Sequence, residues 1–162
     1  MKYILSEKYN TPELMAKIMG PNPIKLEEEL MMGHKIPKNA VVCDLGSGQG
    51  LTSGFLAKEY GFKVYAADLW SEPDDNRRFF EEMGLSEEQI VPVKADAENM
   101  PFEKEFFDAV VSTDSYNYFG RSREYLDEKL LPFVKKGGYI YIAIPGMKKD
   151  CHANLPKELL LS

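Results

Sequence analysis

Residues 41–50 read Val-Val-Cys-Asp-Leu-Gly-Ser-Gly-Gln-Gly. The apolar run 41–45 is typical of a buried parallel strand, and it carries one acidic residue, Asp44, near its end. Glycine then occupies every second position, and Leu51 and Phe55 begin an apolar pattern at helical spacing. The stretch predicts a strand, a glycine-rich turn and a helix. Such a turn lets a ligand lie against bare backbone beside the first N–H groups of the helix.

The spacing of these glycines argues against a dinucleotide site. The dinucleotide fingerprint is G-x-G-x-x-G, and counting from Gly46 or Gly48 puts Leu51 or Ser53 in the third glycine position. The observed pattern is instead acidic-x-G-x-G-x-G, which begins at Asp44. A carboxylate beside the turn would repel a pyrophosphate but suits a ligand that carries an ammonium and a sulfonium. A tight turn without a ligand is the structural alternative.

Bulk properties limit the functional classes. The 162 residues carry a net charge of −6 without a long basic cluster, which predicts one domain that binds no nucleic acid. No membrane-length apolar run or signal peptide is visible, so the expected location is the cytoplasm without membrane partners. Cys43 and Cys151 make no disulfide framework, and Cys43 is expected to be a buried apolar residue. His34 and His152 are isolated from each other, which predicts no metal site.

Four further segments have the pattern of strands: residues 63–68, 90–95, 106–112 and 139–144. The first ends in Asp68, where a carboxylate can accept hydrogen bonds from both ribose hydroxyls, and Leu69 and Trp70 follow it as candidates to pack on an adenine. Pro92 cannot donate to a sheet ladder, so the segment 90–95 is predicted at a sheet edge.

Helical patterns fill most of the intervening chain. Thr11 is predicted to cap a first helix with Leu14, Met15 and Ile18 on its apolar face, and a second helix follows at 24–32. Ser71 is predicted to cap a helix whose Phe79, Phe80 and Met83 face inward. A helix at 121–131 should bury Tyr125, Leu126 and Leu130, and Pro156 should open a helix in the tail.

Several stretches in order resemble one family. The glycine pattern, Phe-Asp-Ala-Val-Val-Ser at 107–112 and the segment LLPFVKKGGYIYIAIP at 130–145 resemble class I S-adenosylmethionine-dependent methyltransferases over about residues 40–145. The resemblance implies an α/β fold, a doubly wound, mostly parallel, Rossmann-like sheet with its strands in the order 3-2-1-4-5. The implied organisation is a single domain, 1–162, with N-terminal helices or a lid at 1–40, a cofactor-binding core at 41–145 and a tail at 146–162.

The resemblance also implies site residues. Asp96 would accept from the adenine amino group and the Ala97 N–H would meet a ring nitrogen, whereas Asp108 is expected to be structural. The implied S-adenosylmethionine-binding residues are Asp44, Gly46, Ser47, Gly48, Gly50, Asp68, Leu69, Asp96, Ala97 and Ser112. Many relatives that act on small molecules have a histidine near Tyr118, and its absence leaves the catalytic residues unknown; location alone suggests Asp114, Tyr116 and Tyr118.

The implied function is methyl transfer from S-adenosylmethionine to a small-molecule acceptor. The alternatives are a non-catalytic S-adenosylmethionine-binding module and a nicotinamide-dependent oxidoreductase. Because family sheets usually have seven strands and only five fit here, we expect a fragment or truncated form of a longer methyltransferase. The fifth strand, 139–144, should then need a cover from another subunit (a homodimer), the N-terminal helices or the tail.

Overall fold

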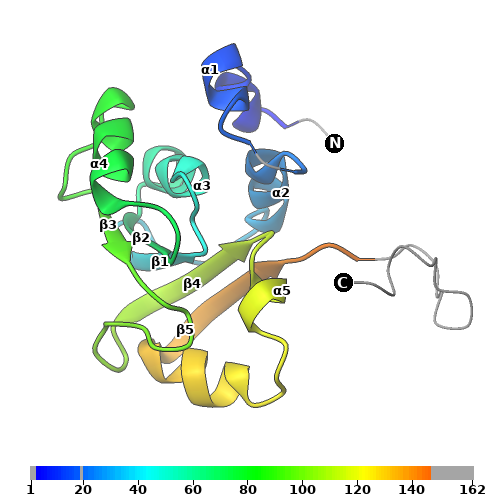
Figure 1. Cartoon of the computed structure of the whole chain (residues 1–162), viewed down its shortest axis with the longest axis vertical. Coiled ribbons are helices and arrows are strands. Elements are labelled where there is room, and N and C mark those ends of the chain that lie inside the picture. Colours follow the sequence, from blue (N-terminus) through cyan, green and yellow to red (C-terminus); the bar gives the residue numbers. More distant parts are fainter. Residues whose placement is uncertain (1–2, 19, 147–162) are drawn as a thin grey trace, which may run out of the picture.

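A five-stranded parallel sheet forms the centre of the computed structural model, which describes residues 3–18 and 20–146. The strand order is β3-β2-β1-β4-β5, and each neighbouring pair is parallel (Figure 1). This confirms the predicted fold class and the order 3-2-1-4-5. The strands are β1 (Val41–Leu45), β2 (Lys63–Asp68), β3 (Ile90–Lys94), β4 (Phe107–Thr113) and β5 (Val134–Ala143).

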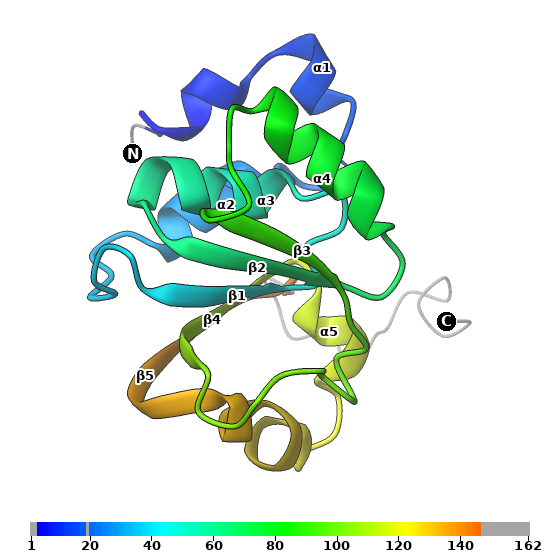
Figure 2. The same cartoon turned by 90° about the vertical axis from the view of Figure 1, so that its left-hand side faces the viewer.

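Helices cover both faces of the sheet. Figure 2 shows α2, α3 and α4 on one face, and α5 with residues 125–133 on the other. The α-helices are α1 (Pro12–Met15), α2 (Pro23–Leu30), α3 (Leu51–Phe55), α4 (Pro73–Glu82) and α5 (Tyr116–Phe119). Shorter turns complete the layers: the 3₁₀ helices η1 (Ser6–Tyr9) and η4 (Leu131–Phe133), and the π-helical segments η2 (Leu56–Tyr60), which continues α3, and η3 (Tyr125–Leu130).

Each face of the sheet has its own hydrophobic core, because side chains alternate along a strand. Val42 of β1 packs with Phe55 of α3 and Phe80 of α4 on the first face. The next residue, Cys43, faces the second core, where Phe107 of β4 also lies. Cys43 is a free, fully buried thiol, as predicted for a small apolar side chain.

Pro92 lies in β3, and β3 forms one edge of the sheet, as predicted. The N–H of Ala95 donates to the carbonyl of Asp68 on β2. Because N–H groups alternate in direction along a strand, the nitrogen of Pro92 points to the outside of the sheet. The missing donor therefore costs no ladder hydrogen bond at this position.

The fifth strand begins earlier than predicted. β5 starts at Val134, which pairs with Phe107, and its register with β4 then shifts so that Tyr139 pairs with Ala109. The segment 136–138, expected to be a turn before the strand, is instead a bulge inside it. Lys135 explains part of this early start, because its Nζ donates to Asp108 Oδ1 at 2.8 Å on the neighbouring strand.

α2 packs against β4 and β5, so one predicted cover, the N-terminal helices, lies over a face of β5. Within residues 3–18 and 20–146, the outer edge of β5 has no partner strand.

Three helix predictions need correction. The helical residues after α5 begin at Tyr125 instead of Arg121, and Leu126 is exposed while Tyr125 and Leu130 are buried. The first helix is only four residues long, so Met15 is exposed, although Thr11 caps it as predicted. Ser71 is not the cap of α4, since Glu72 holds that position and the Ser71 N–H donates to Asp68. The predicted helix at Pro156 lies outside the described residues.

None of the described helices is long and apolar enough to span a membrane. No group of three or more His, Cys, Asp and Glu side chains within residues 3–18 and 20–146 is arranged to hold a metal ion.

Candidate cofactor-binding site

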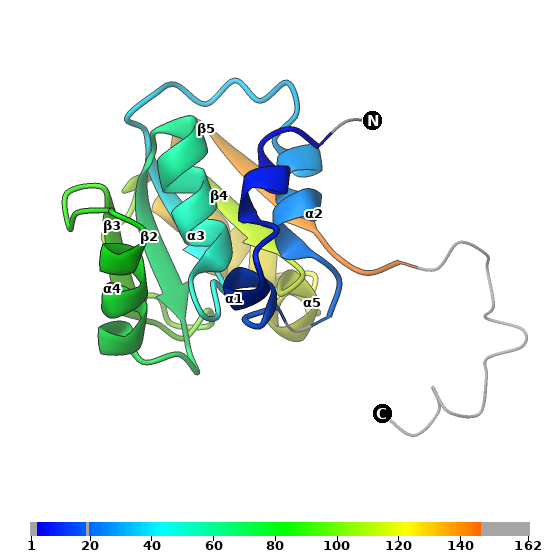
Figure 3. The same ribbon diagram turned by 90° about the horizontal axis from the view of Figure 1, so that it is seen from above.

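The carboxyl ends of β1, β2 and β4 bring most of the predicted site residues to one edge of the sheet. Parallel strands all end at the same edge, and ligands of open α/β sheets bind there. Figures 2 and 3 show α1 at this same end, beside the start of α3. The segment that follows α1 contacts elements on both sides of the glycine turn. Lys17 Nζ lies 4.3 Å from the ring centroid of Phe79 in α4. Gly20 lies beside Asp114, which follows β4.

The three glycines of the turn are glycines for different reasons. A Cβ at Gly46 would lie 2.4 Å from the hydroxyl oxygen of Ser115, and a Cβ at Gly50 would lie 2.5 Å from the ring of Phe80. These two positions are closed by packing. Apart from its two chain neighbours, no atom of the described residues lies within 4 Å of the position that a Cβ at Gly48 would take, and Gly48 has φ of +52°. The turn is therefore open at Gly48, where a ligand could lie against the backbone.

Most N–H groups of the turn are already used inside the protein. The N–H groups of Gly46 and Ser47 donate to the carbonyl of Ala67 on β2, and the Gly50 N–H donates to the carbonyl of Ser47. The Gly48 N–H donates to Asp68 Oδ2 at 2.9 Å. A phosphate cradle needs such groups free for the ligand. The geometry thus agrees with the failed dinucleotide fingerprint.

Asp68 ends β2 as predicted and organises the loops around it. Its Oδ1 accepts the N–H groups of Trp70 and Ser71, both at 2.8 Å, in addition to the Gly48 N–H on Oδ2. A carboxylate offers about four acceptor positions, so three backbone partners leave about one for a ribose hydroxyl. The sequence led us to expect that both hydroxyls would bind here.

Asp44 lies beneath the turn and is almost completely buried. Its Oδ2 accepts hydrogen bonds from Thr52 Oγ1 at 2.7 Å and Ser53 Oγ at 2.6 Å, both at the start of α3. Burial raises the pKa of Asp44 to about 6, the two hydroxyl hydrogen bonds oppose this, and the charge of Asp68 adds to it. The carboxylate therefore anchors α3 to β1 and is partly protonated near neutral pH.

We expect Asp44→Asn to stabilise the protein at pH 7. The pKa of Asp44 in the folded protein, about 6, lies above the ordinary aspartate pKa of 3.8, so the folded state binds more protons than the unfolded state between these two pH values. The stability contribution of Asp44 is then present below about pH 4 and is lost as pH rises through about 6, which amounts to roughly 3 kcal/mol. Urea unfolding from pH 4 to 7 should show that the unfolding free energies of the variant and the wild type become similar at the acid end of this range. Parallel curves would contradict this, and Asp96→Asn at an exposed position is the control.

The predicted adenine-side residues flank the turn on two loops. Leu69 is 42% exposed and Trp70 is 85% exposed after β2. After β3, Asp96 is exposed and its Oδ1 accepts the Glu98 N–H at 2.9 Å, whereas Ala97 is buried. The carbonyl of Ala97 accepts the hydroxyl of buried Tyr125 at 2.9 Å, which fixes this loop to η3. The structure thus leaves the apolar side chains after β2 accessible.

The end of β4 carries the remaining predicted residues. Ser112 is fully buried, and its Oγ donates to the carbonyl of Leu45 at 2.9 Å, linking β4 to the start of the glycine turn. Asp114 has a positive φ of +57°. Burial raises the pKa of Tyr116, whose ring packs on Phe119 and Tyr125, while Tyr118 is 74% exposed. Tyr116 keeps its proton at neutral pH, which makes it a poor general base.

Three contributors were missed from the sequence. Asn76 of α4 is buried and donates from Nδ2 to the carbonyl of Gly48 at 3.0 Å, so α4 holds the open glycine in place. Tyr125 lies in the core as predicted, and the sequence did not show that its hydroxyl also supports the loop at Ala97. Glu27 of α2 is fully buried beside Asp44. A polar residue within an amphipathic helix gives no such signal, because its partners come from distant strands.

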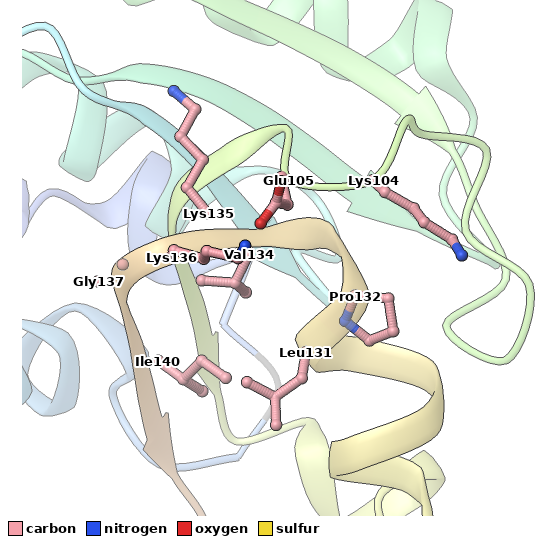
Figure 4. A pocket seen from close by; sticks show the side chains of 10 residues that line it. Lys104, Glu105, Leu131, Pro132, Val134, Lys135, Lys136, Gly137 and Ile140 are labelled. Carbon is pink, nitrogen blue, oxygen red and sulfur yellow. The ribbon is translucent and has the colours of Figure 1, made fainter.

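Of two hollows on the surface of the described residues, the smaller adjoins this edge. The larger, about 670 Å³, lies where β5 begins; Figure 4 shows Leu131, Val134 and Ile140 pointing toward one another there. It lies at the amino ends of the strands, away from the glycine turn. The smaller, about 390 Å³, is lined by residues from the turn, α4 and the segment after α1: Lys17, Gln49, Trp70, Ser71, Glu72, Asp75, Asn76 and Phe79.

The sequence pattern of the methyltransferase domain family matches residues 43–142, which include the glycine turn, Asp68 and the ends of β4 and β5. The chain belongs to the class I S-adenosylmethionine-dependent methyltransferases. This methyltransferase domain is 29% identical over 125 residues to a sarcosine/dimethylglycine N-methyltransferase of Aphanothece halophytica, covering 76% of this chain and 44% of that protein. A protein of the same name from Halorhodospira halochloris is 27% identical over 136 residues, 83% of this chain and 48% of that one.

Solved methyltransferases share the fold. An S-adenosylmethionine-dependent methyltransferase of Aquifex aeolicus has a TM-score of 0.64 at 19% identity, over 93% of this chain and 78% of that one. A phosphoethanolamine N-methyltransferase of Haemonchus contortus, in complex with phosphomonomethylethanolamine and S-adenosylhomocysteine, has a TM-score of 0.74 at 19% identity, over 98% of this chain and 35% of that one. The methyltransferase domain thus spans about half the length of the curated relatives.

The residues of this methyltransferase domain fit the cofactor of its family. The open face of Gly48 is a space that any Cβ would fill. Asp68 keeps an acceptor position beside this face, and most N–H groups of the turn already have partners within the protein, which disfavours a pyrophosphate. These features suit a nucleoside joined to an uncharged or cationic linker, as in S-adenosylmethionine.

Proposed function

We propose that the chain takes part in transferring a methyl group from S-adenosylmethionine to the nitrogen of a small amine acceptor. Two observations support the acceptor class. Both curated relatives are named as N-methyltransferases of sarcosine and dimethylglycine, and each match covers about half of the relative. The site edge also carries an acidic pair, Asp44 and Glu27, and the described residues around it form no basic cluster, which suits a cationic ligand better than an anionic one.

The cofactor-binding roles follow the positions of the predicted residues. Asp68 would hold a ribose hydroxyl, and the backbone from Gly46 to Gly50 would face the linker between ribose and sulfur. Leu69, Asp96 and Ala97 would surround the adenine. Ser112 would shape the end of β4 near the methionine part, since its hydroxyl holds β4 to Leu45.

The chemistry requires positioning more than side-chain reactivity. When bound, S-adenosylmethionine supplies an activated methyl group, which the lone pair of the acceptor nitrogen takes as the sulfonium becomes a thioether. Holding two reactants close and aligned can remove about 7–11 kcal/mol of the barrier. The loop after β4 would hold the acceptor, and Asp114 and Tyr118 on that loop are the candidates to orient the amine. A base is needed only if the acceptor arrives protonated.

The proposal depends most on Gly48, which is open to solvent at the carboxyl ends of the strands. Its N–H donates to Asp68 and its carbonyl accepts from Asn76, so its backbone is fixed on both sides. The experiment is a methyl-transfer assay with labelled S-adenosylmethionine and a panel of glycine, sarcosine, dimethylglycine and phosphoethanolamine. We expect labelled product from at least one amine, and none from catechol as an oxygen-acceptor control. Binding of S-adenosylhomocysteine without transfer to any acceptor would indicate a non-catalytic binding module instead. Absence of cofactor binding would contradict the proposal altogether.

A further inference from the structure

A fully buried carboxyl group without a hydrogen-bond partner lies where α2 packs over the ends of β1 and β4. Glu27 is 0% exposed, and neither of its side-chain oxygens has a hydrogen-bond partner within the described part of the chain. Asp44 lies near enough for its charge to act on Glu27. Two buried carboxyl groups thus share one site, and Thr52 and Ser53 provide hydrogen bonds to Asp44 alone.

The neighbouring residue, Glu28, is an example of a carboxylate in α2 with a structural role. Glu28 is also buried, and it accepts the N–H of Leu5 at 3.0 Å and the N–H of Ser6 at 2.8 Å. Glu28 therefore ties the N-terminal segment to α2. Glu27 has no such contacts, so fastening the helix does not explain its presence.

A hydroxyl without a partner faces the same place. Thr113 Oγ1 is buried at the end of β4 and meets no full hydrogen-bond geometry among the described residues, but it lies close enough to Glu27 for its hydroxyl to lower the pKa of that carboxyl. Glu27, Asp44 and Thr113 therefore gather acceptor oxygens from three elements at the edge where β1 and β4 end. The loops that carry the predicted site residues meet at this edge.

Buried carboxyl groups need either a proton or a cation. Desolvation and the Asp44 charge raise the pKa of Glu27 well above its usual range, so the group is protonated without a ligand. The cations of the elements packed against α2 are Lys8 of η1 and Lys135 and Lys136 of β5, and all three are exposed. Lys8 pairs with Glu59 and Lys135 pairs with Asp108. The buried or partly buried titratable side chains near Glu27 are Tyr9, Asp44, Tyr60, Tyr139 and Tyr141. A position needed only for packing would be filled as well by an apolar residue.

We propose that Glu27, together with Asp44, binds the ammonium group of a ligand that enters at the carboxyl ends of β1 and β4; this rests on the proposed function. An ammonium has three donors, which match the two oxygens of Glu27 and the hydroxyl of Thr113. The amino-acid part of S-adenosylmethionine and an amine acceptor both carry this group. On binding, Glu27 gives up its proton to solvent and the ammonium takes its place as the compensating group.

The test compares Glu27→Gln with Glu28→Gln, the same change one residue further along the helix. We expect Glu27→Gln to bind S-adenosylhomocysteine about 10- to 100-fold more weakly in calorimetry, because a charged hydrogen-bond acceptor is lost. Binding of 5′-methylthioadenosine, which has the nucleoside and thioether but no ammonium, should not change. Glu28→Gln should bind both ligands as the wild type does.

The two measurements, S-adenosylhomocysteine affinity and KM for the amine acceptor, distinguish the two possible sources of the ammonium group. If Glu27→Gln instead raises KM for the amine acceptor and leaves S-adenosylhomocysteine binding intact, the ammonium belongs to the acceptor. Unchanged values in both arms would overturn the inference, and Glu27 would then be a buried acid kept neutral by packing or a bridging water. Failure of the wild type to bind S-adenosylhomocysteine would instead overturn the proposed function.

A measurement on the wild type keeps the test valid if Glu27→Gln does not fold. Calorimetry in two buffers of different ionisation enthalpy counts the protons released on binding. We expect about one proton to leave with the ammonium-bearing ligand and none with 5′-methylthioadenosine. Equal proton counts for the two ligands would overturn the inference.

Discussion

Gly48→Val should give a folded protein that binds S-adenosylmethionine at least about 100-fold more weakly, which corresponds to about 2.8 kcal/mol and the upper range of overpacking costs. Within 4 Å of the new Cβ, the described part of the chain offers no contact beyond the two neighbouring residues, so the side chain projects into the space proposed for the ligand. Its backbone has φ of +52°, which costs a residue other than glycine about 1–2 kcal/mol of stability. Calorimetry with S-adenosylhomocysteine and urea unfolding measure the two effects separately.

Gly50→Ala is the matched control for this prediction. Its Cβ would lie 2.5 Å from the ring of Phe80 in α4, so the damage should appear as lost stability of the α4 packing. Gly48→Val should therefore lose mainly binding, and Gly50→Ala mainly stability. Wild-type affinity in Gly48→Val would mean that the turn is purely structural.

Asp68→Ala should lower both stability and cofactor affinity. Three backbone N–H groups, those of Gly48, Trp70 and Ser71, donate to this carboxylate. Hydrogen bonds to charged groups are worth about 1.5–3 kcal/mol each, and water can replace some of them because Asp68 is only half-buried, so we expect a loss of about 2–3 kcal/mol in unfolding free energy. The sequence alone did not show these contacts, so this loss of stability could not be predicted from it.

Asp68→Asn separates the two effects of that change. The amide oxygen can still accept from Trp70 and Ser71, but its NH₂ group would face the N–H of Gly48. We expect a smaller loss of stability than in Asp68→Ala and a loss of affinity of about tenfold or more. Urea unfolding and calorimetry on the same samples check this. Unchanged affinity in both folded variants would remove Asp68 from the site.

Elements defined by local pattern were predictable from the sequence. β1 and β2 have the predicted bounds because a buried parallel strand is a short apolar run between turn residues. The edge position of β3 followed from Pro92 alone. The early start of β5 did not follow, because the Lys135–Asp108 contact that accompanies it joins residues far apart in sequence.

The candidate site was predictable in position but not in its contacts. The predicted residues Gly48 and Asp68 lie together at the carboxyl edge. Their spacing did not show that Asp44 faces α3 or that Asp68 is largely occupied by backbone donors. Asn76 and Glu27 gave no signal, since each acts through a turn or strand that only the folded chain brings near.

The two described edges of the sheet differ in how well they could pair with an added strand. At β3, the nitrogen of Pro92 faces outward, so an added strand would lack a donor in the middle of its ladder. The sequence of β5 contains no proline, so the N–H and C=O groups along its described outer edge can pair with an added strand on both sides of the bulge. Between the two described edges, β3 is therefore the poorer template for an added strand, because its proline removes one donor from the outward ladder. Pro92 thus protects this edge of the sheet from strand-to-strand aggregation.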